Sequence, residues 1–247
     1  MCAFKFQIYL LFEVYINLVI FQLDMLYMNC VCTLKACFKE IINNNLTNMR
    51  ELIATNNGPY VSRLISYEQR TPILIMELKT LKRQHLTISD TVRMLNMIFS
   101  FQLLATIVIT ISNIIAGLYC YINVRQQSLP TISLKELSHV YILSFIAYYC
   151  IKIVLIVWAC ETGKNQAQQI STSIYDAFNN TTNEQIKDEL QLFSLQIPHC
   201  NNTFSAKGLT VDAKLLTGII GSIVTYLVIL VQFIWDSCKE KTASNIA

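Results

Sequence analysis

An uncharged apolar segment runs from Met94 to Val124, and it limits the possible folds more than any other part of the sequence. A helix of about 20 apolar residues crosses the hydrocarbon core of a bilayer, so this segment predicts a transmembrane helix over residues 97–122. Apolar runs also predict spans over 139–160, which contains the charged residue Lys152, and over 214–235, which is uncharged after Lys214. Charged residues make up only 14% of the 247-residue chain and hydrophobic residues 53%, which argues against a soluble globular domain.

The first 23 residues are long enough to form a fourth span, although Lys5 and Glu13 interrupt them. A secretory signal peptide is the alternative, but Glu13 falls where its apolar centre should be and no A-x-A-like cleavage site follows. We therefore predict a span over residues 1–23. Because a charge facing lipid is costly, Glu13 is expected to face neighbouring helices.

The orientation follows from the distribution of Lys and Arg, which concentrate in cytoplasmic loops. The segments between spans 1 and 2 (residues 24–96) and between spans 3 and 4 (residues 161–213) carry most of them. Together with the adjoining Lys214, these two segments contain Lys35, Lys39, Arg50, Arg63, Arg70, Lys79, Lys82, Arg83, Arg93, Lys164, Lys187 and Lys207. The 123–138 loop and the 236–247 tail carry only Arg125, Lys135, Lys239 and Lys241. Both chain ends are thus predicted outside.

The cytoplasmic segments have helical periodicity of their own. Apolar residues recur at spacings of four and three from Leu74 to Phe99, which predicts one helix continuing from the cytosol into the second span. His85 lies on this face, and we interpret it as a core or interface residue rather than a pH sensor. A shorter stripe from Ile186 to Ile197 ends at Pro198. The sequence therefore predicts an all-α, polytopic membrane helical bundle with cytoplasmic helical extensions.

One edge of the last span is small or polar within an otherwise Ile/Leu/Val helix. Its members follow one another at helical spacing: Gly218, Ser222, Thr225, Ile229, Gln232 and Asp236. Such an edge requires a partner in the membrane. It either packs against other helices of the same subunit or lines a water-filled pore, and the pattern alone favours neither.

Other classes of function lack support in the sequence. The nine cysteines are an odd number without metal-site spacing, so we expect mostly free thiols and no metal site. The net charge of +3 is too small to indicate a nucleic-acid partner. No zinc-protease, nucleophile-elbow or P-loop pattern appears. We therefore predict neither an enzyme nor a cofactor.

The last span also carries a recognisable signature. Residues 225–233, Thr-Tyr-Leu-Val-Ile-Leu-Val-Gln-Phe, resemble the TYhhhhhQF motif (h, hydrophobic) of the insect gustatory receptor family, in which it lies near the C-terminus. Residues 192–196, then Phe204, Gly208, Leu209 and Asp212, are similar to the family's approach to its seventh helix. Members have seven spans, with the C-terminus outside. The four spans here resemble spans four to seven, so the first three are missing and the chain is expected to be a truncated gene model or isoform.

The resemblance implies a plasma-membrane taste receptor that is a ligand-gated, non-selective cation channel. Its partners would be membrane lipid, a small-molecule tastant, and other gustatory receptor subunits in a homo- or heterotetramer. The alternative is a truncated, non-conducting accessory or dominant-negative membrane protein.

Two sets of site residues follow from this resemblance. Pore and gate residues would be Gln232 and Phe233 near the outer end, Thr225 and Tyr226 deeper, and Ser222; we add Ile229 as a hydrophobic constriction. A tastant pocket would draw on Asn113, Tyr119, Tyr141 and Tyr148, with Tyr149 as a further aromatic candidate.

Overall fold

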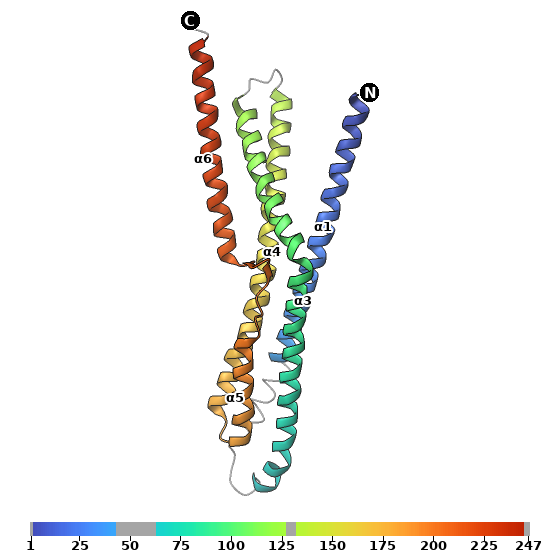
Figure 1. Cartoon of the computed structure of the whole chain (residues 1–247), viewed down its shortest axis with the longest axis vertical. Coiled ribbons are helices and arrows are strands. Elements are labelled where there is room, and N and C mark those ends of the chain that lie inside the picture. Colours follow the sequence, from blue (N-terminus) through green and yellow to red (C-terminus); the bar gives the residue numbers. More distant parts are fainter. Residues whose placement is uncertain (1, 43–62, 127–131, 245–247) are drawn as a thin grey trace. The chain divides into compact units, whose positions relative to one another are not determined.

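The computed structural model describes residues 2–42, 63–126 and 132–244, and these form five helices and one short hairpin (Figure 1). In chain order the elements are α1 (Cys2–Glu40), α3 (Arg63–Gln126), α4 (Ile132–Asn180), α5 (Glu184–His199), β1 (Ser205–Ala206), β2 (Leu209–Thr210) and α6 (Ala213–Ser244). The predicted all-α class is confirmed.

Four helices are long and apolar enough to cross a membrane. The qualifying segments are Val14–Glu40, Thr71–Arg125, Glu136–Asn180 and Ala213–Phe233. α3 has 64 residues and α4 has 49, far more than the roughly 20 residues that a span requires. Both helices therefore extend well beyond their apolar segments, as the periodicity predicted for α3. The side chain of Glu13 lies outside the described residues.

The helices form two compact units, which we describe separately. The first unit comprises Met1–Ser100 and Ala159–Thr210, and the second comprises Phe101–Trp158 and Val211–Ala247. α3 and α4 each run through both units, so the backbone of each helix continues across the boundary.

The first unit is a helical bundle built from α1, α5 and parts of α3 and α4. Asn183 caps the N-terminus of α5: its side-chain oxygen accepts hydrogen bonds from the backbone N–H groups of Gln185 and Ile186. Its predicted apolar stripe is buried at Ile186, Leu190 and Phe193. The helix ends at His199, one residue beyond Pro198.

His85 lies in the core of this bundle, as predicted. Its side chain is fully buried, and its ring stands 5.6 Å from the Phe193 ring and 6.2 Å from the Phe38 ring, centroid to centroid. Asn202 Nδ2 lies 3.5 Å from His85 Nε2. Burial among apolar rings disfavours the charged imidazolium and lowers the pKa of His85 to about 4.

We expect this histidine to make stability depend on pH. The unfolded chain protonates His85 near pH 6.5, whereas the folded chain does so near pH 4, so stability is full above pH 6.5 and is lost as the pH falls towards 4. Between pH 7.5 and 5 the loss should be about 2 kcal/mol. Denaturation of the detergent-solubilised protein measures it. His85→Phe should remove this part of the pH dependence. His199→Gln, at an exposed position, should retain it. If the free energy of unfolding changed equally with pH in the wild type and both variants, His85 would not be its source.

The second unit packs α6 against α3 and α4. A core of Ile107, Ile153 and Ile219 is surrounded by Ile111, Leu215, Leu216 and Ile223. α3 and α4 approach closely at Gly117, where an added Cβ atom would lie 2.8 Å from Ile146 Cγ1. Glycine is therefore required at this point for the two helices to pack as they do.

Residues 205–210 differ from the helical segment that the sequence predicted for 161–213. They form an antiparallel hairpin in which Ser205 pairs with Thr210 and Ala206 with Leu209. The turn residues Lys207 and Gly208 both have positive φ, at 53° and 85°. This left-handed backbone is incompatible with a continuing α-helix, and glycine adopts it without steric cost.

Candidate functional site

α6 begins immediately after the hairpin, at a side-chain cap. Asp212 Oδ1 accepts hydrogen bonds from the backbone N–H of Lys214, at 3.1 Å, and of Leu215, at 3.2 Å. These bonds satisfy amides that have no partner in the first turn of a helix. The sequence from Leu215 onwards is then free to form an uninterrupted apolar helix.

Among the side chains that the structure describes, those on one side of α6 pack against the rest of its unit. Leu215, Leu216, Ile219 and Ile223 pack around the core of the second unit, and Leu227 and Leu230 on the same side are partly buried. At 3.6 residues per turn, this side lies roughly a third of the way around the helix from the small and polar edge.

The small and polar edge of α6 is exposed. Gly218, Ser222, Thr225, Ile229 and Gln232 all have exposed side chains or surfaces. A Cβ atom added at Gly218, or at neighbouring Gly221, would meet nothing within 4 Å. Among the described residues of the second unit, then, no helix packs against this edge. The side chain of Asp236 lies outside the described residues.

The hydroxyl groups on this edge are satisfied by their own helix. Ser222 Oγ donates to the Gly218 carbonyl at 3.0 Å, and Thr225 Oγ1 donates to the Gly221 carbonyl at 2.9 Å. Each hydroxyl oxygen keeps acceptor lone pairs after donating its proton. The exposed edge therefore presents hydrogen-bond acceptors, the kind of group that attracts cations.

The other predicted pore residues are also exposed on α6. Tyr226, Ile229 and Phe233 are exposed by 56%, 41% and 68%. Ser222, Thr225, Ile229 and Gln232 lie on the small and polar edge. Tyr226 and Phe233 follow the core residue Ile219 at intervals of seven and so lie on the packed side of α6, beyond the part that the core covers.

The predicted tastant residues all lie in the second unit. Tyr141 and Tyr148, one above the other on α4, are exposed, as is Tyr119 on α3, and Asn113 is half-buried. Tyr149 is buried, with its ring centroid 4.8 Å from that of Phe145 and 5.0 Å from that of Tyr148.

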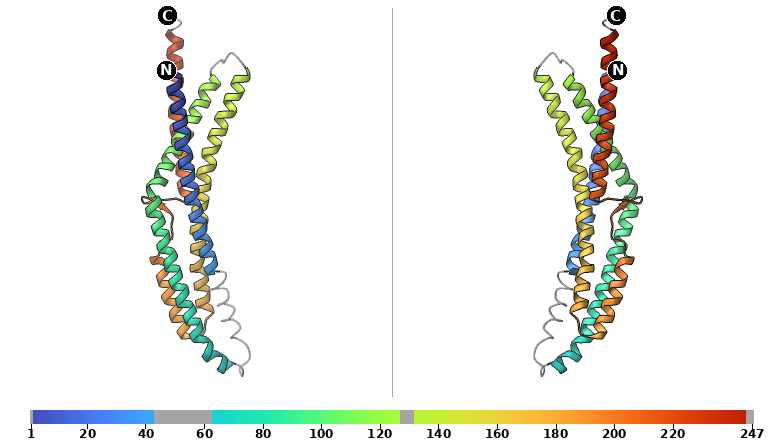
Figure 2. Two further views of the ribbon diagram at one scale, coloured as in Figure 1. Left: turned by 90° about the vertical axis from the view of Figure 1, so that its right-hand side faces the viewer. Right: turned by 90° about the vertical axis from the view of Figure 1, so that its left-hand side faces the viewer.

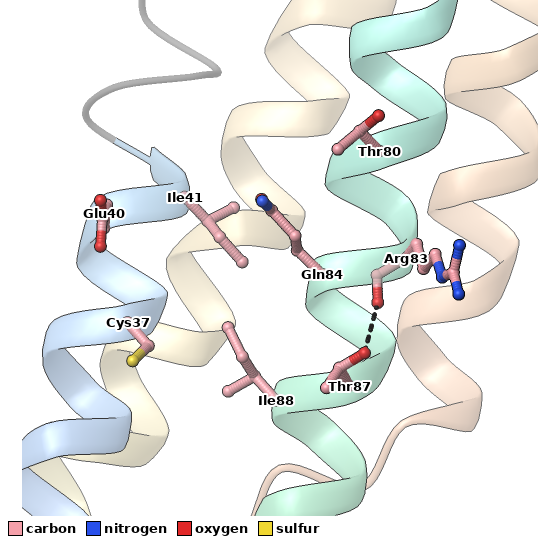
Figure 3. Close-up of a pocket in the computed structure, with 8 residues that line it drawn as sticks. All are labelled: Cys37, Glu40, Ile41, Thr80, Arg83, Gln84, Thr87 and Ile88. Carbon is pink, nitrogen blue, oxygen red and sulfur yellow. Dashed lines mark hydrogen bonds between the residues drawn. The ribbon is translucent and has the colours of Figure 1, made fainter.

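Two cavities of the first unit are lined by other residues. One, of about 580 Å³, lies between α1 and α3 (Figure 3) and is lined by Cys37, Glu40, Ile41, Thr80, Arg83, Gln84, Thr87 and Ile88. The other, of about 390 Å³, lies between α4 and the segment that follows α5, with Lys164 and Asn202 on its wall. Neither includes a predicted tastant residue. Within the described ranges, no group of His, Cys, Asp or Glu could hold a metal ion.

Sequence reasoning missed three polar features of the first unit. Asp24 is almost fully buried in α1. One turn further on, the Tyr27 hydroxyl lies 3.3 Å from Cys160 Sγ of α4. Asn96 on α3 bonds to the segment before α6. In the sequence, each of these features is marked only by a polar residue beside an apolar helix face. That pattern is too common to single out Asp24, Tyr27 or Asn96.

Comparisons with known proteins show which family this chain is similar to. A family model described as 7tm chemosensory receptor matches residues 2–235. Putative gustatory receptor 28b of Drosophila melanogaster is 29% identical over 156 residues, covering 62% of this chain and 33% of that protein. Putative gustatory receptor 28a of the same fly is 25% identical over 171 residues, covering 68% of this chain and 38% of that protein. The chain thus spans about a third of the length of these relatives.

The fold also resembles a solved structure. The insect olfactory receptor OR5 from Machilis hrabei, determined in complex with eugenol, superposes with a TM-score of 0.55 at 13% identity, over 85% of this chain and 46% of that one. With nearly the whole chain matched by the family model and the helical arrangement shared with this receptor, the chain belongs to the 7tm chemosensory receptor family.

Proposed function

We propose that this multi-pass membrane protein is a subunit of a taste receptor that opens a non-selective cation pore when a small molecule binds. The observation that carries the proposal is the exposed edge of α6 (Gly218, Ser222, Thr225, Ile229 and Gln232), which no described residue of its own unit covers. The family is one of receptors, not of enzymes, in agreement with the sequence prediction.

A pore accounts for this edge better than lipid does. Amide and hydroxyl groups facing hydrocarbon are costly, and residues of this kind in transmembrane helices face protein or water. Copies of α6 around a central axis would give the edge both: helix neighbours at its sides and water in front. The resemblance to gustatory receptors implies four copies, and the outward lone pairs of Ser222 and Thr225 suit the passage of cations.

Individual roles follow from position along α6. Gln232 and Phe233 would form the gate near the outer end, with Thr225, Tyr226 and Ser222 deeper. Ile229 would narrow the pore between them and stop ions by dewetting when the channel is closed. The excess of Lys and Arg in residues 24–96 and 161–213 supports a cytoplasmic position for these segments and a C-terminus outside. The plasma membrane is the location that a taste receptor requires.

The ligand would be a small tastant. Two relatives are named putative gustatory receptors, and the structurally similar olfactory receptor was solved with eugenol bound. Asn113, Tyr119, Tyr141 and Tyr148 remain the candidate pocket residues, because aromatic walls with a few polar groups suit such ligands.

A non-conducting accessory or dominant-negative subunit is the second candidate. Current recordings from oocytes expressing this chain alone, a full-length gustatory receptor alone, or both would separate the candidates. Suppression of the receptor's current by the chain would favour the accessory role.

Cysteine accessibility tests the pore. In a cysteine-free background, Ser222→Cys and Thr225→Cys should react with a charged, membrane-impermeant thiol reagent about tenfold faster than Val224→Cys, because thiolate forms only in contact with water. Val224 is an exposed residue on another side of the same helix and serves as the matched control. Reaction should also reduce the current. Equal, slow reaction at all three positions, with and without stimulus, would refute a water-lined edge.

A further inference from the structure

The hairpin before α6 cannot hold its position alone. Each strand has two residues, and isolated two-stranded hairpins are at best marginally stable in water. Nevertheless Phe204 and Ala206 are almost completely buried. Tertiary contacts must therefore determine where the hairpin lies, and Figure 2 shows it against α3 just before α6 begins.

Two side chains of α3 provide polar contacts to the hairpin. Asn96 Nδ2 donates to the Thr203 carbonyl at 2.7 Å, while Asn96 Oδ1 accepts from the Ser205 backbone N–H at 3.1 Å. One turn further along, Ser100 Oγ accepts from the Lys207 backbone N–H at 3.0 Å. Residues four apart lie on the same helix face, so α3 bonds three backbone groups between Thr203 and Lys207 from one side.

Apolar packing fixes the same segment from another direction. A Cβ atom added at Gly163 of α4 would lie 2.8 Å from Phe204 Cε2 and 3.4 Å from Val31 Cγ1 of α1. The Phe204 ring thus occupies the space that a side chain at position 163 would need. Phe204, immediately before the hairpin, is thus packed on α4, while α3 bonds the backbone of the same segment.

The hydrogen bonds between α3 and the hairpin link two parts of the chain, because the hairpin leads directly into α6 and α3 continues to the candidate pocket residues. Only Val211 and Asp212 separate β2 from α6, and Asp212 is the cap of α6. In the other direction, α3 continues without a break from Asn96 to Asn113 and Tyr119, the candidate pocket residues, over roughly 35 Å of helix. A rotation or shift of α3 would therefore be felt at the hairpin as well as at those residues.

We propose that Asn96 and Ser100 form a clamp that couples α3 to the inner end of the pore helix, so that ligand-induced movement of α3 changes the position of α6. This inference rests on the proposed channel function. Asn96 is a positioning residue here: it acts on gating through the hairpin and lies on α3, not on the proposed pore lining.

Single-channel recording tests the coupling without requiring an agonist. The full chain is co-expressed with a full-length gustatory receptor, and spontaneous open probability is compared with unitary conductance. Asn96→Ala should change open probability by about fivefold or more, the effect of losing hydrogen bonds to a partly buried backbone, and leave conductance unchanged. Asn96→Asp keeps the acceptor for Ser205 but loses the donor for Thr203, so its change should be intermediate. Thr91→Ala is the control, because this exposed hydroxyl bonds only to the Thr87 carbonyl of its own helix among the contacts described.

Hydrogen exchange supplies a readout that is independent of current. In nanodiscs, Asn96→Ala should accelerate exchange at the Ser205 amide, and Ser100→Ala at the Lys207 amide, by about tenfold, with Thr91→Ala unchanged. Faster exchange with unchanged open probability would overturn the coupling role and leave the channel intact. Unchanged exchange would overturn the clamp itself. Absence of any current attributable to this chain would overturn the proposed function, and the coupling role with it.

Discussion

Gln232→Lys is expected to suppress the cation current of the proposed channel by about one to two orders of magnitude. A positive charge about 6 Å from a passing monovalent cation costs roughly 0.7 kcal/mol in a water-like medium, and four copies around an axis would add about 3 kcal/mol. Each 1.4 kcal/mol is a factor of ten in ion occupancy. Gln232 is exposed on α6, so the longer side chain does not have to displace packed neighbours among the described residues.

Other substitutions at Gln232 separate the effect of the side chain's charge from the effect of its shape. Gln232→Asn keeps a neutral amide and should conduct, whereas Gln232→Glu should favour cations over anions more strongly than the wild type. Gln232→Ala is expected to alter gating or permeation without blocking the pore. Whole-cell current and reversal potentials under asymmetric salt measure these effects. Normal current in the lysine variant, with normal surface expression, would remove Gln232 from the ion path.

Loss of the Phe193 side chain is expected to cost the first unit about 3 to 5 kcal/mol, as is typical of Phe→Ala in a close-packed core. Phe193 is fully buried in α5, and its ring is tilted by 66° to the His85 ring at a centroid distance of 5.6 Å. Removing it leaves a cavity beside an imidazole that already lacks a partner for Nδ1 in the described structure. The measurement is chemical denaturation of the detergent-solubilised protein, supported by surface expression.

Leu195→Ala is the control for this prediction. It lies on the same helix and is 59% exposed, so its truncation should cost well under 1 kcal/mol. Equal destabilisation by the two variants would mean that α5 does not contribute a specific packed face to the bundle.

Much of the helical structure could be predicted from local sequence. The run from Leu74 to Phe99 repeats apolar residues on one helix face, and the structure continues that helix into the apolar segment that follows. The Ile186–Ile197 stripe likewise forms α5. These predictions succeed because a helix and its buried face depend on residues three and four apart, which lie together in the sequence.

The candidate site was only partly predictable. The pattern from Gly218 to Gln232 identified an unusual helix edge, but it did not say whether another helix of the chain covers it. The packed side of α6 is set by Ile107 of α3 and Ile153 of α4, residues far away in the sequence. Exposure of the edge is therefore a result of tertiary packing.

The sequence alone determined the all-α class and the apolar segments able to cross a membrane. It also determined the helices that extend past these segments and the terminal motif with its polar edge. Apolar length and helical period are local properties, and they suffice for these. The tertiary structure decided which side of α6 the second unit leaves uncovered. It also placed His85 between Phe38 and Phe193 and brought Asn96 and Ser100 to the hairpin. Those contacts join residues dozens of positions apart, and their energies depend on distances and burial that exist only once the helices have packed.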